Sequence, residues 1–225
     1  MKAQLLAVAA LALSAFVATP AAAQVNGIAV AEPAISIASS QAFQTANQQI
    51  GTTFQAQRTQ LEQLQQQRAT AIRQFDTNAD GQLSQEEQTA AQANAAAVQQ
   101  VQAFDQQIEQ IQTPIIAARV FVVEQIAMQL SAAFQQVVTQ NNVQLVLNPS
   151  TALYVADPAD LTDDITAVLN QSVPTVSTAV PEGWQPQQQS VNLYQQVQEV
   201  LLAAAAQQQA AAAQQPAAAQ PVQGR

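Results

Sequence analysis

Residues 76–87 read DTNADGQLSQEE and carry the side chains in this chain best suited to bind a divalent cation. In calcium loops of this length, positions 1, 3 and 5 supply side-chain oxygens, position 7 a backbone carbonyl, position 9 often a water-mediated contact and position 12 a bidentate carboxylate. The sixth position is Gly81, where the turn around the ion needs a backbone conformation that a Cβ disfavours. The sequence therefore predicts calcium ligands at Asp76, Asn78, Asp80, Gln82 and Glu87, with Ser84 at the water-mediated position.

An acidic turn that needs no ion is the alternative interpretation of this loop. It leaves the joint placement of three carboxylates, an amide and a glycine unexplained. Such loops usually work in pairs, and the sequence contains no second copy of the pattern. A single loop with three liganding carboxylates predicts weak binding, with a Kd on the order of 10⁻⁴ to 10⁻³ M.

The composition argues against enzymatic chemistry. Cysteine and histidine are both absent, which removes disulfides, zinc sites and the usual nucleophile and proton-transfer machinery. The five glycines are scattered, so no phosphate-binding loop can be assembled from them. Two carboxylate pairs, Glu86 with Glu87 and Asp163 with Asp164, fit the first turns of helices. We therefore predict a protein that is not an enzyme and has no catalytic or organic-cofactor site.

The N-terminus has the layout of a secretory signal peptide. Lys2 precedes an apolar run over residues 5–17, and small residues at 21–23 precede Gln24. The run is too short for a confident membrane span, so an uncleaved anchor is the weaker interpretation. We expect residues 1–23 to be removed near Ala23/Gln24 and the mature chain to have no integral membrane span. Without Lys2, five arginines face fifteen acidic residues, a net charge of −10, which makes nucleic acid and anionic membranes poor partners.

Two long helical patterns flank the calcium loop and must position it. From a plausible N-cap at Ser39 or Ser40, large residues follow a seven-residue period to Phe75. After the loop, the three-four spacing resumes at Ala97 and continues to Val122. These two apolar stripes, called seams here, predict an antiparallel helical hairpin. The hairpin would form an arm over about residues 39–141 with the loop at its tip. Pro114 lies within the return helix and predicts a kink or hinge there.

A small body follows from the residues at both ends of the arm. Residues 27–31 favour a strand that Pro33 ends, residues 143–147 and 152–155 favour two strands of a hairpin, and residues 160–170 favour a short helix. The fold class is therefore α+β, with a β body over residues 26–31 and 143–172. Aromatic residues are only 4 % of the chain, so the core is small. Its open sheet edges favour oligomerisation.

The last part of the chain, residues 184–225, is rich in Gln, Ala and Pro and predicts a low-complexity tail. Trp184 fits a packing anchor better than a ligand platform. Residues 191–214 have the composition of a conditional helix, with a partial apolar stripe that includes Leu193 and Val197. We expect the end of the chain to be disordered.

Two segments carry a resemblance to a known family. They are VQLVLNPSTALYVADPADLTDDITAVLN, over residues 143–170, and GIAVAEPAISIASSQAF near the mature N-terminus. Over roughly residues 24–172 the chain resembles the OmpH/Skp family of periplasmic chaperones, which defines a predicted domain over residues 24–183. The resemblance implies a trimer whose three arms enclose a cavity for unfolded outer-membrane proteins in transit through the periplasm. It implies no catalytic residues. The acidic composition departs from the basic arms of the best-known members, and the calcium pattern at the arm tip is not a general feature of the family.

Two functional hypotheses follow. The first is an ATP-independent periplasmic holdase for unfolded outer-membrane proteins, with a calcium-binding loop at the arm tip. The alternative is a calcium-binding envelope scaffold that bridges folded partners through its tips and tail, without holdase activity. The missing nucleotide motifs, together with the arm architecture, favour the holdase.

Overall fold

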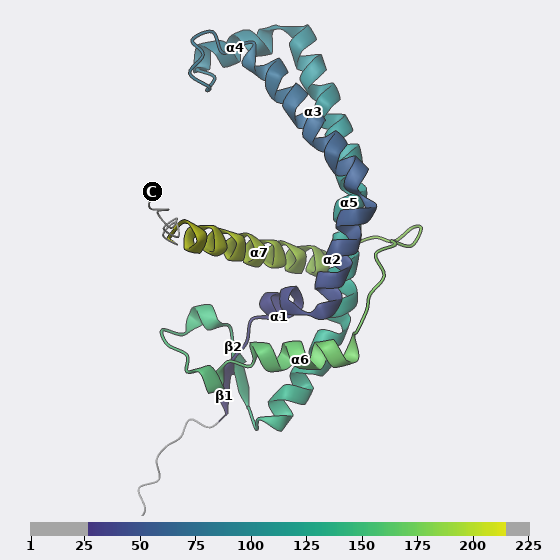
Figure 1. Cartoon of the computed structure of the whole chain (residues 1–225), viewed down its shortest axis with the longest axis vertical. Helices are drawn as coiled ribbons and strands as arrows, with labels where there is room; N and C mark the ends of the chain where they lie inside the picture. Colours follow the sequence, from purple (N-terminus) through teal and green to yellow (C-terminus); the bar gives the residue numbers. More distant parts are fainter. Residues whose placement is uncertain (1–26, 215–225) are drawn as a thin grey trace, which may run out of the picture.

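The computed structural model describes residues 27–214, which form a small body and a long curved helical arm (Figure 1). The predicted signal peptide and the end of the tail lie outside the described residues. The body contains β1 (Ile28–Val30), α1 (Pro33–Ser39), β2 (Leu145–Leu147) and α6 (Thr162–Ser172). The arm contains α2 (Gln41–Thr53), α3 (Gln55–Arg73), α4 (Gln85–Ala93) and the first half of α5 (Ala95–Gln140), whose second half lies in the core of the body. A last helix, α7 (Gln188–Gln214), packs on the body.

The sheet is smaller than predicted. β1 and β2 pair in parallel, with Ile28 opposite Leu145 and Val30 opposite Leu147. On the other side of β1, a single bridge joins Val30 to Asp160, and the N–H of Leu161 donates to the carbonyl of Val30 over 2.9 Å. The fold is thus mostly helical with a two-stranded parallel sheet.

The predicted strand over residues 152–155 is wrong, and with it the hairpin. Pro149–Thr151 forms a 3₁₀ turn, which the Asn148 side chain caps by accepting from the N–H of Ser150 over 2.9 Å. The chain then turns away from β2 and runs through a second 3₁₀ turn at Asp157–Ala159. Leu153 and Tyr154 are left almost fully exposed. Although these residue types favour strands, this segment has no adjacent strand with which to pair.

The outgoing half of the arm is three helices rather than one. Ser40 separates α1 from α2 and caps α2, its hydroxyl accepting from the N–H of Phe43 over 3.3 Å, as the sequence indicated. A second break falls at Phe54, where φ is −102° and ψ is 20°. The predicted seam is confirmed by burial. It is half-buried or buried at Phe43, Ile50, Phe54, Leu61, Leu64, Ala71 and Phe75.

The return half confirms the antiparallel hairpin, since α3 packs along α5. It also holds a break that was not predicted, because Asn94 ends α4 and caps α5 by accepting from the N–H of Ala97 over 3.2 Å. Pro114 lies inside α5 without ending it. Phe54 and Pro114 line one cavity of about 540 Å³, so the break in the outgoing path and the proline of the return path lie at the same level.

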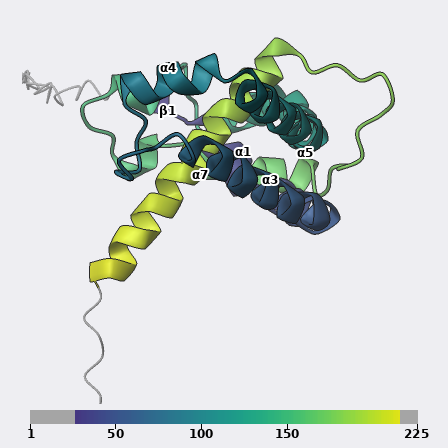
Figure 2. The same cartoon turned by 90° about the horizontal axis from the view of Figure 1, so that it is seen from above.

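The core lies where the second half of α5 meets α1, α2, α6 and α7. By composition α5 is long and apolar enough to cross a membrane, yet its apolar residues Val122, Val123, Ile126 and Val137 are packed inside this core. The helix expected within residues 191–214 is present as part of α7, and Val197 is fully buried. Figures 1 and 2 both show α7 crossing the body and extending beyond it.

Residues 173–187, called the strap here, run along α5 from α6 to α7. The side chain of Gln125 both donates to the carbonyl of Ser177 over 2.8 Å and accepts from its N–H over 3.0 Å. Val176 and Val180 pack against the core. Trp184 acts as the packing anchor that the sequence indicated, since its ring contacts Phe121 edge to face.

Candidate functional site

The loop at the tip of the arm brings three of the predicted calcium ligands together around backbone amides. Asp76 accepts from the N–H of Asp80 over 3.2 Å and from the N–H of Gly81 over 2.8 Å. Asn78 accepts from the N–H of Asp80 over 3.0 Å, and Asp80 accepts from the N–H of Gln82 over 2.8 Å. Gly81 has φ +84°, the left-handed region in which a side chain would be strained. The loop is therefore held closed by its own side-chain oxygens.

The third carboxylate of the prediction, Glu87, has other partners. Its Oε1 accepts from the N–H and the hydroxyl of Thr77, over 2.7 and 2.6 Å. Its Oε2 accepts from the N–H and the hydroxyl of Ser84, both over 2.9 Å. Ser84 in turn accepts from the N–H of Glu87, which completes a capping box at the start of α4. Glu87 thus ties the first half of the loop to the first turn of α4.

These contacts also set the acidity of Glu87. The side chain is buried, and four donors stabilise its ionised form. The Thr77 hydroxyl bond contributes most, followed by the bonds from the Ser84 N–H, the Thr77 N–H and the Ser84 hydroxyl, and together they lower the pKa of Glu87 to about 2. The carboxylate is therefore charged at any pH at which the protein is expected to work.

The predicted ligand set is only partly assembled. Asp76, Asn78 and Asp80 lie together, whereas both oxygens of Glu87 are engaged by Thr77 and Ser84. Ser84, predicted for a water-mediated contact, is the N-cap of α4. Over residues 27–214, no three Asp, Glu, His or Cys side chains lie close enough together to bind a metal ion. In this arrangement the residues do not form a complete calcium site.

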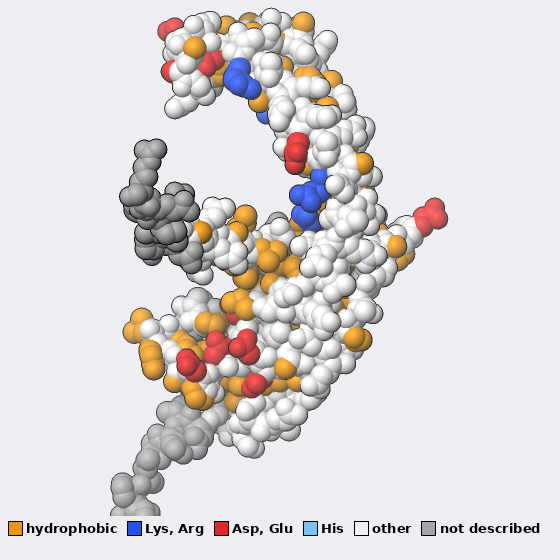
Figure 3. Space-filling view, viewed as in Figure 1, with side chains coloured by type: hydrophobic (Ala, Val, Ile, Leu, Met, Phe, Trp, Pro, Cys, Tyr) orange, Lys and Arg blue, Asp and Glu red, His pale blue; other side chains and the backbone are white. Residues whose placement is uncertain are grey.

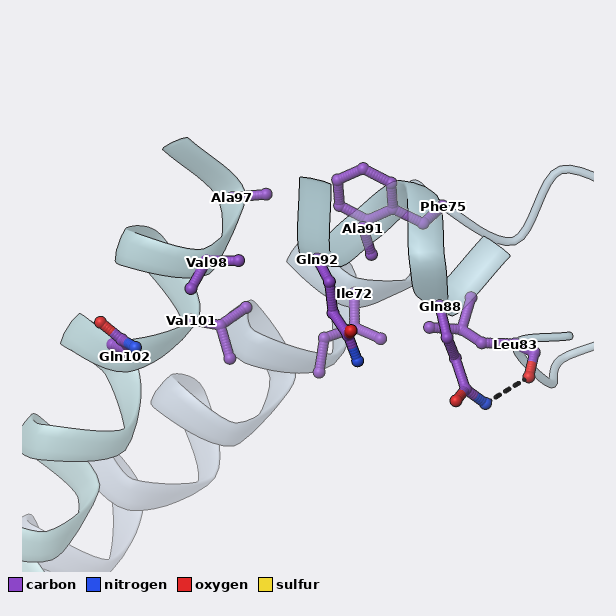
Figure 4. A pocket seen from close by; sticks show the side chains of 10 residues that line it. All are labelled: Ile72, Phe75, Leu83, Gln88, Ala91, Gln92, Ala97, Val98, Val101 and Gln102. Carbon is purple, nitrogen blue, oxygen red and sulfur yellow. Dashed lines mark hydrogen bonds between the residues drawn. The ribbon is translucent and has the colours of Figure 1, made fainter. Parts of the chain in front are cut away.

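Beside the loop, the structure contains an apolar cavity of about 270 Å³, called the tip cavity here. Ile72 reaches it from the last turn of α3, Phe75 from the turn that follows, and Leu83 from the loop, and residues of α4 and α5 complete the wall (Figure 4). The full lining comprises Ile72, Phe75, Leu83, Gln88, Ala91, Gln92, Ala97, Val98, Val101 and Gln102.

The sequence did not indicate the tip cavity, although Phe75, Ala97 and Val101 fit the spacing of the two seams. The cavity arises because the chain breaks at Asn94, so that α4 leaves the line of α5 and the end of the seam is not closed by a partner. The signal that could have revealed it is Asn94 itself, a good N-cap residue in a run of alanines. An apolar Leu83 between polar neighbours was a second signal.

Lower on the arm, one ion pair crosses between the two paths of the hairpin. Arg68 Nε and Asp105 Oδ1 lie 2.5 Å apart, and both side chains are exposed. An exposed pair of this kind contributes only about 0–1 kcal/mol to stability. Figure 3 shows the blue Arg side chains of the arm on its concave side, facing the space between the tip and the body.

Comparison with known proteins gives one family and one related structure. Residues 27–169 match the family described as Outer membrane protein (OmpH-like). A crystal structure of a candidate outer membrane chaperone (OmpH-like) from Caulobacter crescentus is similar at 18 % identity and a TM-score of 0.39, covering 67 % of this chain and 88 % of that chain. No curated protein sequence matches the chain.

Proposed function

Because the chain belongs to the OmpH-like outer membrane protein family, a chaperone family without enzymatic activity, we propose that it is an ATP-independent holdase for unfolded outer-membrane proteins. The observation that carries this proposal is the curved arm, in which α3 and α5 rise from the body and leave a concave side facing α7 (Figure 1). Such a surface can hold a polypeptide by many weak contacts without a specific pocket for each client. The clients meet this protein in the periplasm, where the predicted signal peptide would deliver it.

The same proposal includes assembly into a trimer. β2 has no strand on its outer side among residues 27–214, and an open edge of this kind invites pairing with another chain. Large apolar side chains cluster on and beside the sheet and are exposed in the single chain. They are Ile28, Leu145, Leu147, Leu153 and Tyr154. In Figure 3, orange side chains gather on this part of the body.

Sedimentation of the mature chain tests the assembly. We expect a trimer at micromolar concentration for the parent, and dissociation when Leu145→Glu places a charge on the exposed sheet face. Leu202→Glu is the matched control, because Leu202 is an exposed leucine on α7 far from the sheet in the sequence, and it should leave the trimer intact. A monomeric parent would rule out the trimer.

Light scattering tests the holdase function. A denatured outer-membrane protein is diluted into buffer with and without the purified mature chain, in the absence of nucleotide. We expect aggregation to be suppressed at a stoichiometric ratio, because apolar segments of the client are held on the arms. Unchanged aggregation at a large excess of the chain would refute the holdase function. Recovery of one or two folded partners instead of unfolded clients in an envelope pull-down would favour the scaffold alternative.

We also propose that the tip loop binds calcium weakly, through Asp76, Asn78, Asp80, Gln82 and Glu87. The gathering of Asp76, Asn78 and Asp80 in one turn with Gly81 supports this proposal. The bonds of Glu87 to Thr77 and Ser84 oppose it, because the carboxylate must leave these donors to reach an ion. Calorimetric titration tests whether calcium binds. We expect heat of calcium binding in the parent and in Glu86→Gln, but none in Glu87→Gln. Absence of heat in the parent would leave the loop an ion-free turn.

A further inference from the structure

The tip cavity presents almost only carbon to an occupant. Its five large wall residues, Ile72, Phe75, Leu83, Val98 and Val101, are each only half-buried, so their apolar surface is still partly open to water. None of the ten lining side chains is charged. Burying such a surface is favourable only for an apolar group, since a polar one would lose its hydrogen bonds to water. The chemistry of the wall therefore excludes ions and charged small molecules.

The size of the tip cavity matches one side chain. An enclosed apolar cavity of about 150 Å³ accommodates a benzene molecule. The tip cavity, at about 270 Å³, therefore has room for the ring of one Phe, Tyr or Trp and its first carbons, but not for a helix. Phe75 lies in the wall and offers an edge or face to an entering ring.

The mouth of the cavity is polar but neutral. Gln92 and Gln102 are exposed, and each amide can both donate and accept a hydrogen bond. Gln88 is also at the mouth, with its Nε2 bonded to the carbonyl of Leu83 over 2.8 Å (Figure 4). Such amides suit the N–H and C=O groups of an extended backbone, which carries one of each per residue.

The charge around the tip selects among such segments. From the last turn of α3 to the first turn of α4, Asp76, Asp80, Glu86 and Glu87 are opposed only by Arg73. Within about a Debye length, roughly 8–10 Å, this negative field repels acidic segments and favours basic ones.

We propose that the tip cavity binds a single aromatic side chain of an extended, unfolded outer-membrane protein segment whose flanking residues are neutral or basic. This inference rests on the proposed holdase function and gives it a defined contact. Strands of outer-membrane barrels alternate apolar and polar residues and carry aromatic residues at both membrane interfaces, so an unfolded client offers such rings in extended segments. A tip that captures them would hold the client at the end of the arm as well as along it.

The test uses the full mature chain and short soluble peptides of alternating sequence. One peptide has a central Tyr between Lys residues, a second has the same Tyr between Glu residues, and a third has Ser in place of Tyr. With the first peptide, methyl NMR should show chemical-shift changes at Ile72, Leu83, Val98 and Val101. The second peptide should bind at least tenfold more weakly. The third peptide should cause no shift changes at these residues. Shifts confined to the body, or equal binding of the Ser peptide, would overturn the inference.

Two variants fill the cavity from different sides. Val98→Phe places a ring in it from α5, and Ala91→Leu reduces its volume from α4. Each should weaken binding of the Tyr peptide at least tenfold. Gln99→Phe adds the same ring at the adjacent exposed position, which does not line the cavity, and should bind like the parent. If both filled variants, folded by circular dichroism, bind the peptide as the parent does, the cavity is not the site.

Aggregation assays on the same proteins distinguish failure of the holdase function from failure of the tip contact. A parent that fails to suppress aggregation refutes the holdase function, whatever the peptides do. A parent that suppresses aggregation, with filled variants that bind the Tyr peptide unchanged, refutes only the tip contact. Support for both requires suppression by the parent and loss of peptide binding in Val98→Phe and Ala91→Leu but not in Gln99→Phe.

Discussion

Trp184 donates its indole N–H to the buried carboxylate of Glu124 over 3.0 Å. The other oxygen of the same carboxylate accepts from the N–H of Gln187 over 3.4 Å, immediately before α7 begins. The Trp184 ring also packs against Phe121, with ring centroids 5.3 Å apart and planes at 69°. Glu124 therefore links the end of the strap, the start of α7 and the core face of α5.

Removing the indole donor should loosen this junction. Trp184→Phe keeps a ring beside Phe121 but leaves the Glu124 carboxylate with one donor fewer, and an unpaired buried polar group costs about 1–3 kcal/mol. We expect urea unfolding, followed by circular dichroism, to show a loss in that range. Glu124→Gln keeps one acceptor oxygen for the indole N–H but puts an NH2 group, which cannot accept, beside the N–H of Gln187, so it should lose only the longer of the two bonds and less stability. Equal stability of Trp184→Phe and the parent would mean that the bond contributes nothing.

The docking of α7 should depend on Val197. This side chain is fully buried against the core, and truncating it to Ala removes two methyl groups and leaves a cavity, a cost of about 2 kcal/mol. Leu202→Ala on the same helix is the control, since Leu202 is 70 % exposed and should change stability by less than about 0.5 kcal/mol. Hydrogen exchange in α7 should accelerate only in Val197→Ala. Equal exchange in the two variants would show that α7 is not held by this contact.

The arm was predictable because its signal is local. Apolar residues recur with helical spacing on both sides of the tip, and the structure buries those same positions against each other. The break at Phe54 was not predictable, since no capping side chain marks it. The strand expected at residues 152–155 failed for a different reason. Whether a segment becomes a strand depends on a partner elsewhere in the chain, and Tyr154 has none among the described residues.

In the tail and at the tip, too, the structure depends on contacts that the local sequence does not reveal. Residues 184–225 are rich in Gln and Ala and contain few large apolar residues. Val197 becomes a core residue only because α7 packs on α1 and α5. At the tip, the loop pattern predicted Glu87 as a calcium ligand, but it could not show that Glu87 is bonded to Thr77 and Ser84. Competition between these donors and an ion is a property of the folded loop.

The stability of the tip should depend on pH through Glu87. Its pKa falls from 4.5 to about 2 on folding, so the folded state binds this proton less tightly than the unfolded state. The contribution is therefore complete above about pH 4.5 and is lost as the pH falls towards 2. We expect hydrogen exchange corrected for intrinsic rates to show opening of residues 76–87 across this window.

Glu86 provides the matched control for that titration. It is exposed and adjacent, and it does not hold Thr77 or Ser84. Glu86→Gln should retain the opening between pH 4.5 and about 2, whereas Glu87→Gln should open the loop at all pH values and flatten the profile. An unchanged profile in Glu87→Gln would assign the pH dependence to other carboxylates.

Pro114 should weaken α5 locally although it does not end the helix. Proline lacks the N–H that would bond to the carbonyl four residues earlier, and in a helix interior it costs about 3 kcal/mol relative to alanine. Pro114→Ala restores the donor and should slow hydrogen exchange over residues 110–118. Thr113→Ala, a change in the same exposed turn that leaves the backbone donors intact, should not. Unchanged exchange in Pro114→Ala would mean that this turn is no hinge.

The pairing of β1 with β2 joins segments that are far apart in the chain, which should affect the order of folding. These strands meet only after the whole arm has been traversed, and closing a loop of that length on an unstructured chain costs about 4 kcal/mol in entropy. The hairpin of α3 and α5 needs no such closure beyond its short tip, and once formed it brings the two strands within reach. We therefore expect the arm to form first and to speed the folding of the body. Shortening it by matched turns of α3 and α5 should leave refolding of the body intact, whereas disrupting its seam should slow that refolding.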